Sequence, residues 1–444
     1  MNNASPSAVP HDPYAVFRIR DFRLYLTGRL VSATGQQMFG MAIGWELYER
    51  TGSALALGMV GLTQVLPMYL FTLPAGHVAD SYNRKKIILL MTFVVALANL
   101  GLTAVSALGA PVGWFYVCLF AASSARTFLM AASASFMPQL VPRKIFSHAV
   151  TWNVSVFQTA SIIGPLLAGM VIGHLHHAAW VYALNTLAAL VFCGLLARVD
   201  YRQPATTPQE MTFQTLLNGF RFVFSTRIIL GLITLDMFAV LLGGATALLP
   251  IYAKDILFVG PTGLGMLQAA LPFGSVCCAF VVAHRRPMLR AGHAMLWAVM
   301  VFGVATIAFG LSQWFWVSIA MLFACGCADN VSVVVRHTLV QMLTPDEKRG
   351  RVSAVNNLFI GTSNELGEAE SGAVAHLYGQ FIGNTAATGA MIAAVSGGIG
   401  TIYVVVVVAL MWPEIRKYGR LDGGVKTVDD VTEIRPSQPG NALE

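Results

Sequence analysis

The sequence predicts an all-α membrane protein of twelve transmembrane helices in two pseudo-symmetric six-helix bundles. Three observations lead to this fold class. Only 11% of the 444 residues are charged and 56% are hydrophobic, whereas about a quarter of a soluble protein is charged. Apolar runs of about 17–25 residues, long enough to cross a bilayer as helices, recur along the chain. Matching residues also recur at a constant offset of 203 positions.

The apolar runs are expected to be helices because backbone groups in lipid must form hydrogen bonds within the protein. We count twelve of them, each bounded by polar or turn-forming residues. The predicted spans are 24–48, 54–79, 86–107, 113–137, 150–173, 178–197, 228–252, 262–283, 291–311, 314–337, 352–382 and 389–412.

These spans divide the chain into five parts. The polar tail 1–21 lacks the basic and apolar pattern of a cleaved signal peptide and is expected to be cytoplasmic. Two six-helix bundles follow at 22–197 and 228–412, and the chain ends in a cytoplasmic tail, 413–444. The linker 198–227 has apolar residues at helical spacing, which fits either an interfacial helix or a cytoplasmic extension of the seventh span.

The positive charges predict the orientation. Of the 28 Lys and Arg residues, 23 lie in the tails and the even-numbered loops, and only Arg50 and Lys254 lie in the odd-numbered loops. Cytoplasmic loops are enriched in Lys and Arg, so both termini are predicted to be cytoplasmic. The same bias accounts for the net charge of +7, so nucleic-acid binding is not expected.

The internal repeat indicates two related halves. Five pairs share the offset of 203: Leu140 and Leu343, Pro142 and Pro345, Asn153 and Asn356, Gly164 and Gly367, and Gly169 and Gly372. Paired halves with a binding site between them are typical of secondary transporters.

Charged and polar residues within the spans are the candidate site residues, because an ionised group in lipid costs several kcal/mol unless it has a partner, water or a proton. The candidates for proton coupling are Glu365, Glu368, Asp236 and Asp329. The candidates for the substrate cavity are Arg29, Gln36, Gln37, Arg126, Asn153 and Arg336. The repeat offset sets Arg126 against Asp329, which suggests a pair across a central cavity.

The segment SNELGEAESG places three glutamates in one predicted span. At 3.6 residues per turn, Glu365 and Glu368 lie within about 60° of each other, and Glu370 lies about 140° from Glu365. Two carboxylates on one buried face favour binding of a proton. Glu365 and Glu368 are therefore either proton carriers or permanently paired, with Arg336 as one partner. Glu370 is expected to be structural.

Other polar clusters receive simpler interpretations. Glu46, Glu49 and Arg50, at the outer end of the first span, are expected to form a solvated interface. The six cysteines fall inside spans, so neither a disulfide framework nor a metal site is expected. The sequence HLHH (174–177) reads as a surface cluster. No cofactor is expected, no phosphate-binding loop is present, and no nucleophile–base set indicates an enzyme.

The loop GHVADSYNRKK resembles the signature between the second and third spans of the major facilitator superfamily. The resemblance implies a cytoplasmic gate motif. Gly76 would permit close helix contact, Asp80 would take the acidic role, and Arg84 and Lys85 would face the cytosol. Ser81 departs from the family's usual Arg, which leaves the gate network open. The resemblance also implies the major facilitator fold, in which spans one, four, seven and ten line the cavity.

Two further stretches refine the resemblance. The sequence SIIGPLLAG, with Gly164, Pro165 and Gly169, is similar to the antiporter motif of this superfamily; its small residues also fit simple helix packing, as do Gly367 and Gly372. The stretch from Asp329 to Gly372 resembles the branch of bacterial siderophore exporters and related efflux proteins.

The resemblance implies export of a siderophore-like or drug-like small molecule across the inner membrane, by alternating access and proton antiport, by a monomer in the lipid bilayer. Two alternatives stay open. One is a lipid or lysophospholipid transporter, which an apolar cavity with lateral openings would favour. The other is a non-transporting membrane sensor. The 32-residue tail 413–444 is short for an output domain, which counts against this alternative.

Overall fold

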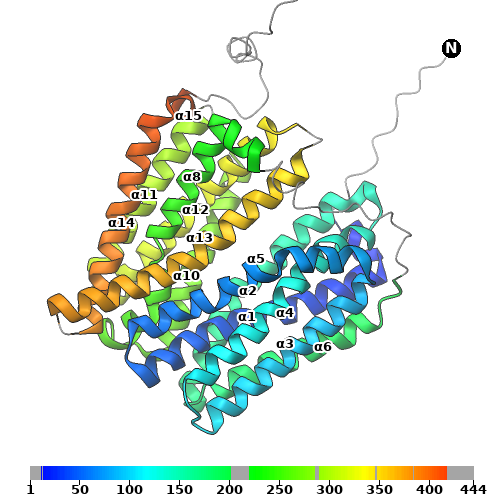
Figure 1. The fold of residues 1–444 in the computed structure, drawn as a ribbon, viewed down its shortest axis with the longest axis horizontal. Helices are drawn as coiled ribbons and strands as arrows, with labels where there is room; N and C mark the ends of the chain where they lie inside the picture. The colour runs from blue at the N-terminus through cyan, green and yellow to red at the C-terminus, as the bar shows by residue number, and fades with distance from the viewer. Residues whose placement is uncertain are drawn as a thin grey trace, which may run out of the picture.

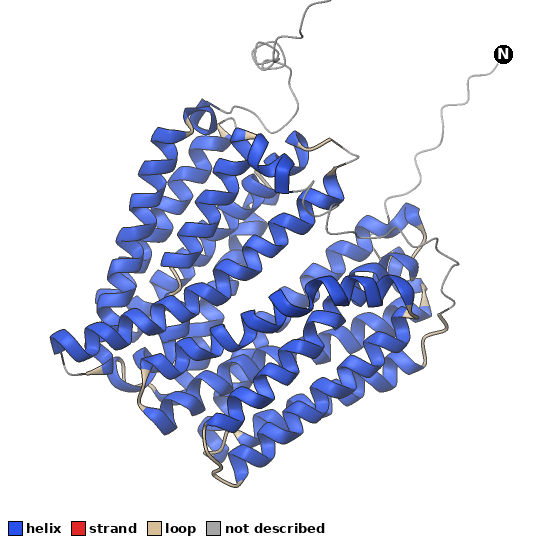
Figure 2. Ribbon diagram, in the orientation of Figure 1, coloured by secondary structure: helices blue, strands red, loops and turns tan. Residues whose placement is uncertain are grey.

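The computed structural model describes residues 12, 14–201, 220–285, 290–345, 348–383 and 385–417. Among these residues the secondary structure is helical, with no strand (Figure 2). The helices of the first half are α1 (Arg20–Thr51), α2 (Ala54–Ser81), α3 (Arg84–Ala107), α4 (Gly113–Phe136), α5 (Phe146–Leu175) and α6 (Ala179–Ala197). Short 3-10 turns lie at Ala15–Arg18, Met137–Gln139 and Arg143–Ile145.

The second half contains longer helices and a group of short ones. Its long helices are α8 (Arg227–Leu242), α10 (Gly260–Ala283), α11 (Ala291–Leu311), α12 (Phe315–Leu343), α13 (Arg349–Tyr378) and α14 (Ala386–Met411). Its short elements are η4 (Ala245–Leu248), α9 (Leu249–Ile251), η5 (Tyr252–Ile256), η6 (Gly379–Gly383) and α15 (Pro413–Lys417).

Ten of the helical segments are long and apolar enough to cross a membrane. Helices α1 and α13 are as long, with 32 and 30 residues, but they carry more polar and charged side chains. Helix α1 packs against α5 and α6. Helix α13 packs against α8 and α14 and, across the contact between the halves, against α2. The predicted count of twelve spans therefore depends on these two helices and stays a prediction.

The helices form two groups, as Figure 1 shows, with α1–α6 on one side and α8 to α15 on the other. Successive helices run in opposite directions. We call the end where α1 begins and α14 ends the terminal end, and the opposite end the distal end. The linker predicted at 198–227 lies largely outside the described residues, although residues 220–225 are helical.

The seventh span is broken, which the sequence did not predict. Helix α8 ends at Leu242, and the chain continues through the 3-10 helix η4, the short α9 and the π-helix η5. The break lies at Gly243 and Gly244. A Cβ atom on Gly244 would lie 2.7 Å from Gly367 O of α13, and one on Gly243 would lie 2.8 Å from Phe302 Cε1. Only glycine allows the chain to approach α13 and α11 this closely at the break.

The buried apolar residues form a joint core at the distal end and separate cores at the terminal end. One cluster contains Phe39 and Leu47 of the first half together with Tyr252 and Leu267 of the second. A second cluster belongs to the terminal end of α8 and α11–α15. A third belongs to the terminal end of α1–α6. The two halves are therefore packed together distally and have their own cores at the terminal end.

Glycines carry the contact between the halves. Helix α2 packs against α13, and α5 packs against α10. A Cβ on Gly372 of α13 would lie 2.6 Å from Gly58 Cα of α2. A Cβ on Gly169 of α5 would lie 2.7 Å from Pro261 O and 3.3 Å from Gly265 Cα of α10. Close backbone approach through small residues is the usual way in which helices associate in lipid, where apolar side chains gain little by leaving the bilayer.

The other two repeat glycines pack within their own halves. A Cβ on Gly164 of α5 would lie 2.9 Å from Thr34 O of α1, and one on Gly367 of α13 would lie 3.0 Å from Val240 O of α8. Gly164 and Gly367 therefore occupy matching places, and so do Gly169 and Gly372, which bridge the halves. This correspondence supports the interpretation of the 203-residue offset as a structural repeat.

Candidate transport cavity

A central cavity of about 580 Å³ lies between the two halves. Its walls come from α1, α2 and α5 of the first half and from η4, α9, α10, α12 and α13 of the second. The predicted lining by spans one, seven and ten is observed. The fourth span, α4, does not line this cavity, whereas α2, α5, α10 and α13 do.

The lining of the central cavity combines apolar side chains with a set of polar ones, two of which are acidic. Five glutamines share it: Gln36, Gln37, Gln64, Gln158 and Gln268. Asp329 and Glu368 are its two acidic residues. The glutamine amides offer both donors and acceptors, so this wall can bind a polar cargo in more than one orientation.

A second cavity of about 490 Å³, which we call the side chamber, lies within the first half. It is lined by residues of α1 and α3–α6, and it shares Gln36, Gln37 and Phe157 with the central cavity. Arg29, Arg126 and Asn153, predicted as cavity residues, all line it. The two cavities therefore meet at one shared wall and differ in the sign of their charged residues.

The second half contains a buried group of charges beside the central cavity. Arg336 of α12 forms an ion pair with Asp236 of α8, and their side chains are 5% and 10% exposed. Asp329 lies about two helical turns before Arg336 on α12 and is close enough to interact electrostatically with both Arg336 and Asp236. Asp236 and Arg336 line neither of the two large cavities. Arg336 was expected to line the substrate cavity, and in this structure Asp236 holds it inside the bundle instead.

Arg126 has partners that the repeat did not predict. Its Nη2 donates a hydrogen bond of 2.6 Å to Gln36 Oε1 on α1. The negative charge that acts on it from the other half is Glu365, not Asp329. The suggested Arg126–Asp329 pair is thus replaced by two separate relationships, Arg126 with Glu365 and Asp329 with Arg336.

The three glutamates of α13 occupy three different environments. Glu368 lines the central cavity. Glu365 lies at the contact with α2 and is not among the residues that line the central cavity, and its buried Oε2 has no hydrogen-bond partner among the described residues. Glu370 accepts a hydrogen bond of 3.4 Å from Ser371 Oγ. Arg336 is not the partner of any of them, since it is bound to Asp236.

Gly61 of α2 places the first two glutamates at the boundary between the halves. A Cβ on Gly61 would lie 2.9 Å from Glu368 Cβ and 3.4 Å from Ala369 N. Helix α2 therefore passes directly over the turn that carries Glu365 and Glu368. The turn that carries the two carboxylates therefore belongs to the contact between the halves.

The loop between α2 and α3 forms a compact polar network at the terminal end. Arg84 pairs with Asp80 at 3.7 Å and is only 7% exposed, so it does not face the solvent as expected. Lys85 Nζ donates to Ala197 O at 2.9 Å and Val199 O at 2.7 Å, at the carboxyl end of α6. A cation is favourable at that end of a helix. Gly76 makes no close helix contact here, because an added Cβ would meet nothing within 4 Å.

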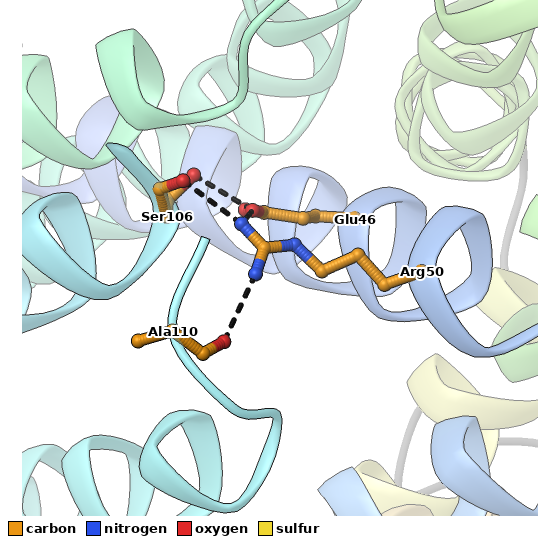
Figure 3. Close-up of polar contacts among 4 residues, drawn as sticks. All are labelled: Glu46, Arg50, Ser106 and Ala110. Atoms are coloured by element: carbon orange, nitrogen blue, oxygen red, sulfur yellow. Dashed lines mark hydrogen bonds and ion pairs between the residues drawn. The ribbon is translucent and has the colours of Figure 1, made fainter. Parts of the chain in front are cut away.

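The distal end of α1 carries a buried ion pair where a solvated interface was expected. Glu46 is 4% exposed and pairs with Arg50 at 2.6 Å. Figure 3 shows that Arg50 also donates to the carbonyl oxygens of Ser106 and Ala110, at 2.9 and 3.2 Å, while Ser106 Oγ donates to Glu46 Oε1 at 2.7 Å. The end of α3 covers Glu46, and only Glu49 of the three is exposed.

A neighbouring contact joins the two halves at the distal end. Tyr48 of α1 donates a hydrogen bond to Asp255 of η5, and Lys254 Nζ lies 5.6 Å from the centre of the Tyr48 ring. We call these three residues the distal latch. It lies on the same side of the molecule as the joint apolar core.

Several lining residues were not singled out from the sequence. They include Gln64, Gln158 and Gln268 in the central cavity, and Thr92 and Asn185 in the side chamber. Each is a polar residue inside an apolar run, which is itself a signal for a residue that faces a cavity. Among the described residues no group of three or more His, Cys, Asp or Glu side chains is arranged to hold a metal ion.

Comparison with solved structures places this architecture among known transporters. A bacterial homologue of the human lysosomal transporter Spinster, solved in an inward-facing unoccupied conformation, matches with a TM-score of 0.69 at 14% identity, over 89% of this chain and 97% of that one. The nucleoside transporter NupG matches with a TM-score of 0.68 at 12% identity, over 88% of this chain and 100% of that one. At these identities the likeness shows the fold.

The sequence comparisons show the family. The enterobactin exporter EntS of Escherichia coli O1:K1 / APEC is 25% identical over 403 residues, which are 89% of this chain and 93% of the relative. EntS of Citrobacter koseri is 26% identical over 406 residues, with the same coverage. Residues 11–408 match the profile of the transmembrane secretion effector family. This multi-pass membrane protein therefore belongs to the transmembrane secretion effector family of the major facilitator superfamily.

Proposed function

We propose that this protein is a secondary active exporter that moves a siderophore-like or drug-like organic molecule across the bacterial inner membrane by alternating access. The observation that carries the proposal is the polar cavity between two repeated halves, with its adjoining chamber. A binding site at the interface of repeats is the usual arrangement in secondary transporters. The similarity to enterobactin exporters supports export of a small molecule.

Proton coupling is assigned to the carboxylates at this interface. Glu368 and Asp329 face the central cavity, and Glu365 lies within the electrostatic reach of Arg126 in the other half. Binding a proton at Glu368 removes a negative charge from the turn that contacts α2. Keeping a group ionised inside the membrane costs several kcal/mol. Loss of that charge is therefore enough to shift the equilibrium between the two conformations of a transporter. Asp236 is assigned a structural role because Arg336 neutralises it.

Both termini are proposed to be cytoplasmic, following the distribution of Lys and Arg. With that orientation the joint distal core closes the periplasmic side, and the terminal end, where the halves have separate cores, faces the cytoplasm. A fluorescent protein fused after Glu444 should fluoresce, and alkaline phosphatase fused there should be inactive. The reverse result would invert the proposed orientation.

An apolar cavity with lateral openings would favour the lipid-transport alternative. The wall of the central cavity has many apolar residues, but it also carries five glutamines and two acidic residues. The sensor alternative does not require a cavity shared by both halves. The polar side chains on this wall favour a cargo that carries several polar groups.

The experiment that tests the proposal is transport in everted membrane vesicles. Enterobactin and the cationic dye ethidium are added outside, and the proton gradient is imposed by ATP hydrolysis in the vesicle membrane. Accumulation of either compound that needs both this protein and the gradient supports the proposal. Accumulation of neither, or accumulation that a proton ionophore leaves unchanged, contradicts it.

A further inference from the structure

The side chamber has the chemistry of an anion-binding subsite. Its two charged lining residues are both basic: Arg29 of α1 and Arg126 of α4. None of the residues that line it is acidic. Arg29 forms no hydrogen bond or ion pair with any of the residues that the structure describes. Arg29 is partly buried, so its guanidinium can bind an anion that enters the chamber.

Two further donors in the chamber are buried without partners. Thr92 of α3 is 2% exposed and Asn185 of α6 is 3% exposed. Within the described part of the chain, the Thr92 hydroxyl and the Asn185 Nδ2 have no hydrogen-bond partner. A buried donor left unsatisfied is unfavourable. Both residues line the chamber, and although the two donor atoms are covered in this conformation, rotation of their side chains would present them to a ligand with acceptor oxygens.

The packing of α1 against α6 explains why Asn185 is held at this place. A Cβ on Gly35 of α1 would lie 2.7 Å from Asn185 Oδ1 and 2.9 Å from Ala188 Cβ. Because Gly35 has no side chain, α6 can pack Asn185 directly against α1. Gly35 lies six residues after Arg29 on the same helix. Four helices, α1, α3, α4 and α6, thus contribute donors to one chamber.

The shared wall determines how a cargo would extend from the subsite. Gln36, Gln37 and Phe157 border both cavities, and Arg126 already binds Gln36. Ligand pockets in proteins are commonly about 300–1,000 Å³, so the side chamber of about 490 Å³ can hold a charged head with an attached ring. The remainder of a larger cargo would pass the shared wall and enter the glutamine-lined central cavity.

We propose that the cargo is an organic acid whose anionic group is bound in the side chamber by Arg29 and Arg126, with hydrogen bonds from Thr92 and Asn185. This inference rests on the proposed transport function, because it names the substrate class that the same site would select. It also separates the tasks of the two halves. The first half binds the anion, and the carboxylates of the second half respond to the proton.

The test compares two fluorescent probes that share one body and differ in charge. Dansylglycine carries a carboxylate, and dansylglycinamide is its neutral amide. Binding to the purified full-length protein is followed by dansyl fluorescence. Hydrogen bonds to charged groups contribute about 1.5–3 kcal/mol, so dansylglycine is expected to bind about tenfold or more tightly than dansylglycinamide.

The variants assign that preference to residues. Arg29→Gln and Arg126→Gln should each abolish it, Arg29→Lys should retain most of it, and Thr92→Val should reduce it several-fold. Arg227→Gln removes an exposed cation elsewhere and should leave it unchanged. Size-exclusion profiles show which variants are folded. If Arg29→Gln does not fold, Arg29→Lys and Arg126→Gln still test the assignment.

The outcomes separate this inference from the proposed function. Equal affinity for the two probes, or no binding of dansylglycine, overturns the anion subsite even if enterobactin or ethidium is exported. A preference for dansylglycine that survives Arg29→Gln and Arg126→Gln also overturns it. A preference that both substitutions abolish supports the subsite, and if no transport is then seen, the export proposal fails separately.

Discussion

Gly58 of α2 and Gly372 of α13 lie against each other with no side chain between them, at a contact between the two halves. A Cβ atom on Gly372 would lie 2.6 Å from both Gly58 Cα and Gly58 N. These atoms belong to the backbone, so they cannot move aside as a flexible side chain would. The distal contact of α2 with α13 therefore depends on glycine at position 372.

Gly372→Ala should weaken the distal closure. Overpacking of this kind costs about 1–3 kcal/mol, which corresponds to roughly a 5–150-fold shift between two conformations. The measurement is labelling of a cysteine placed at Thr246, in the central cavity, by a membrane-impermeant thiol reagent after the native cysteines are replaced. Labelling from the distal side should rise. Gly194→Ala is the matched control, since a Cβ there meets nothing within 4 Å, and equal labelling in the two variants would contradict the expectation.

Tyr48→Phe should open the same end by removing one bond of the distal latch. The substitution deprives Asp255 of the Tyr48 hydroxyl, and losing a partner of a charged group costs about 1–3 kcal/mol. The same cysteine-labelling assay should report higher accessibility from the distal side. Tyr116→Phe removes a hydrogen bond to Ala56 O inside the first half, so it should leave the labelling unchanged. A similar response to both substitutions would show that the latch does not join the halves.

Breaking the Asp236–Arg336 ion pair on one side should destabilise the second half. Arg336→Gln or Asp236→Asn leaves a buried charge without its partner, at a cost of about 3–5 kcal/mol. The double variant Asp236→Leu/Arg336→Met removes both members of the pair and should lose less than the sum of the single variants. Some loss should remain, because Asp329 also faces the Arg336 charge. Thermal unfolding of the purified protein in detergent measures all three. Additive losses would mean that the pair is not coupled.

Glu46→Gln should lower stability, whereas Glu49→Gln should not. Glu46 is buried and paired with Arg50, while Glu49, three residues later, is exposed. Removing the charge at Glu46 leaves Arg50 with the carbonyl oxygens of Ser106 and Ala110 and the face of the Phe115 ring, and the expected loss is about 1–3 kcal/mol. Thermal unfolding again supplies the measurement. Equal melting temperatures for the two variants would restore the original view of a solvated interface.

Sequence patterns predicted the features that depend on one helix at a time. Apolar runs located the helices, and the repeat located Gly164, Gly169, Gly367 and Gly372. Polar residues inside spans pointed to Gln36, Gln37, Arg126 and Asn153, which do line the cavities.

The sequence did not determine which charges pair, because pairing depends on the rotation and crossing of neighbouring helices. Arg336 therefore pairs with Asp236 rather than with a glutamate of α13. The same reason explains Glu46, which is buried because the end of α3 covers it. The break after Leu242 was also missed, since Gly243 and Gly244 look like ordinary small residues until α11 and α13 are packed against them.

The most direct test of proton-coupled export compares two kinds of transport in proteoliposomes for Glu368→Gln, Glu365→Gln and Glu370→Gln. Exchange of labelled for unlabelled enterobactin needs the cavity alone, whereas efflux driven by an imposed pH gradient also needs the proton carrier. We predict that Glu368→Gln retains exchange and loses most gradient-driven efflux. Glu365→Gln should weaken gradient-driven efflux, and Glu370→Gln should leave both kinds of transport intact. Full gradient-driven efflux in both Glu365→Gln and Glu368→Gln would contradict the account.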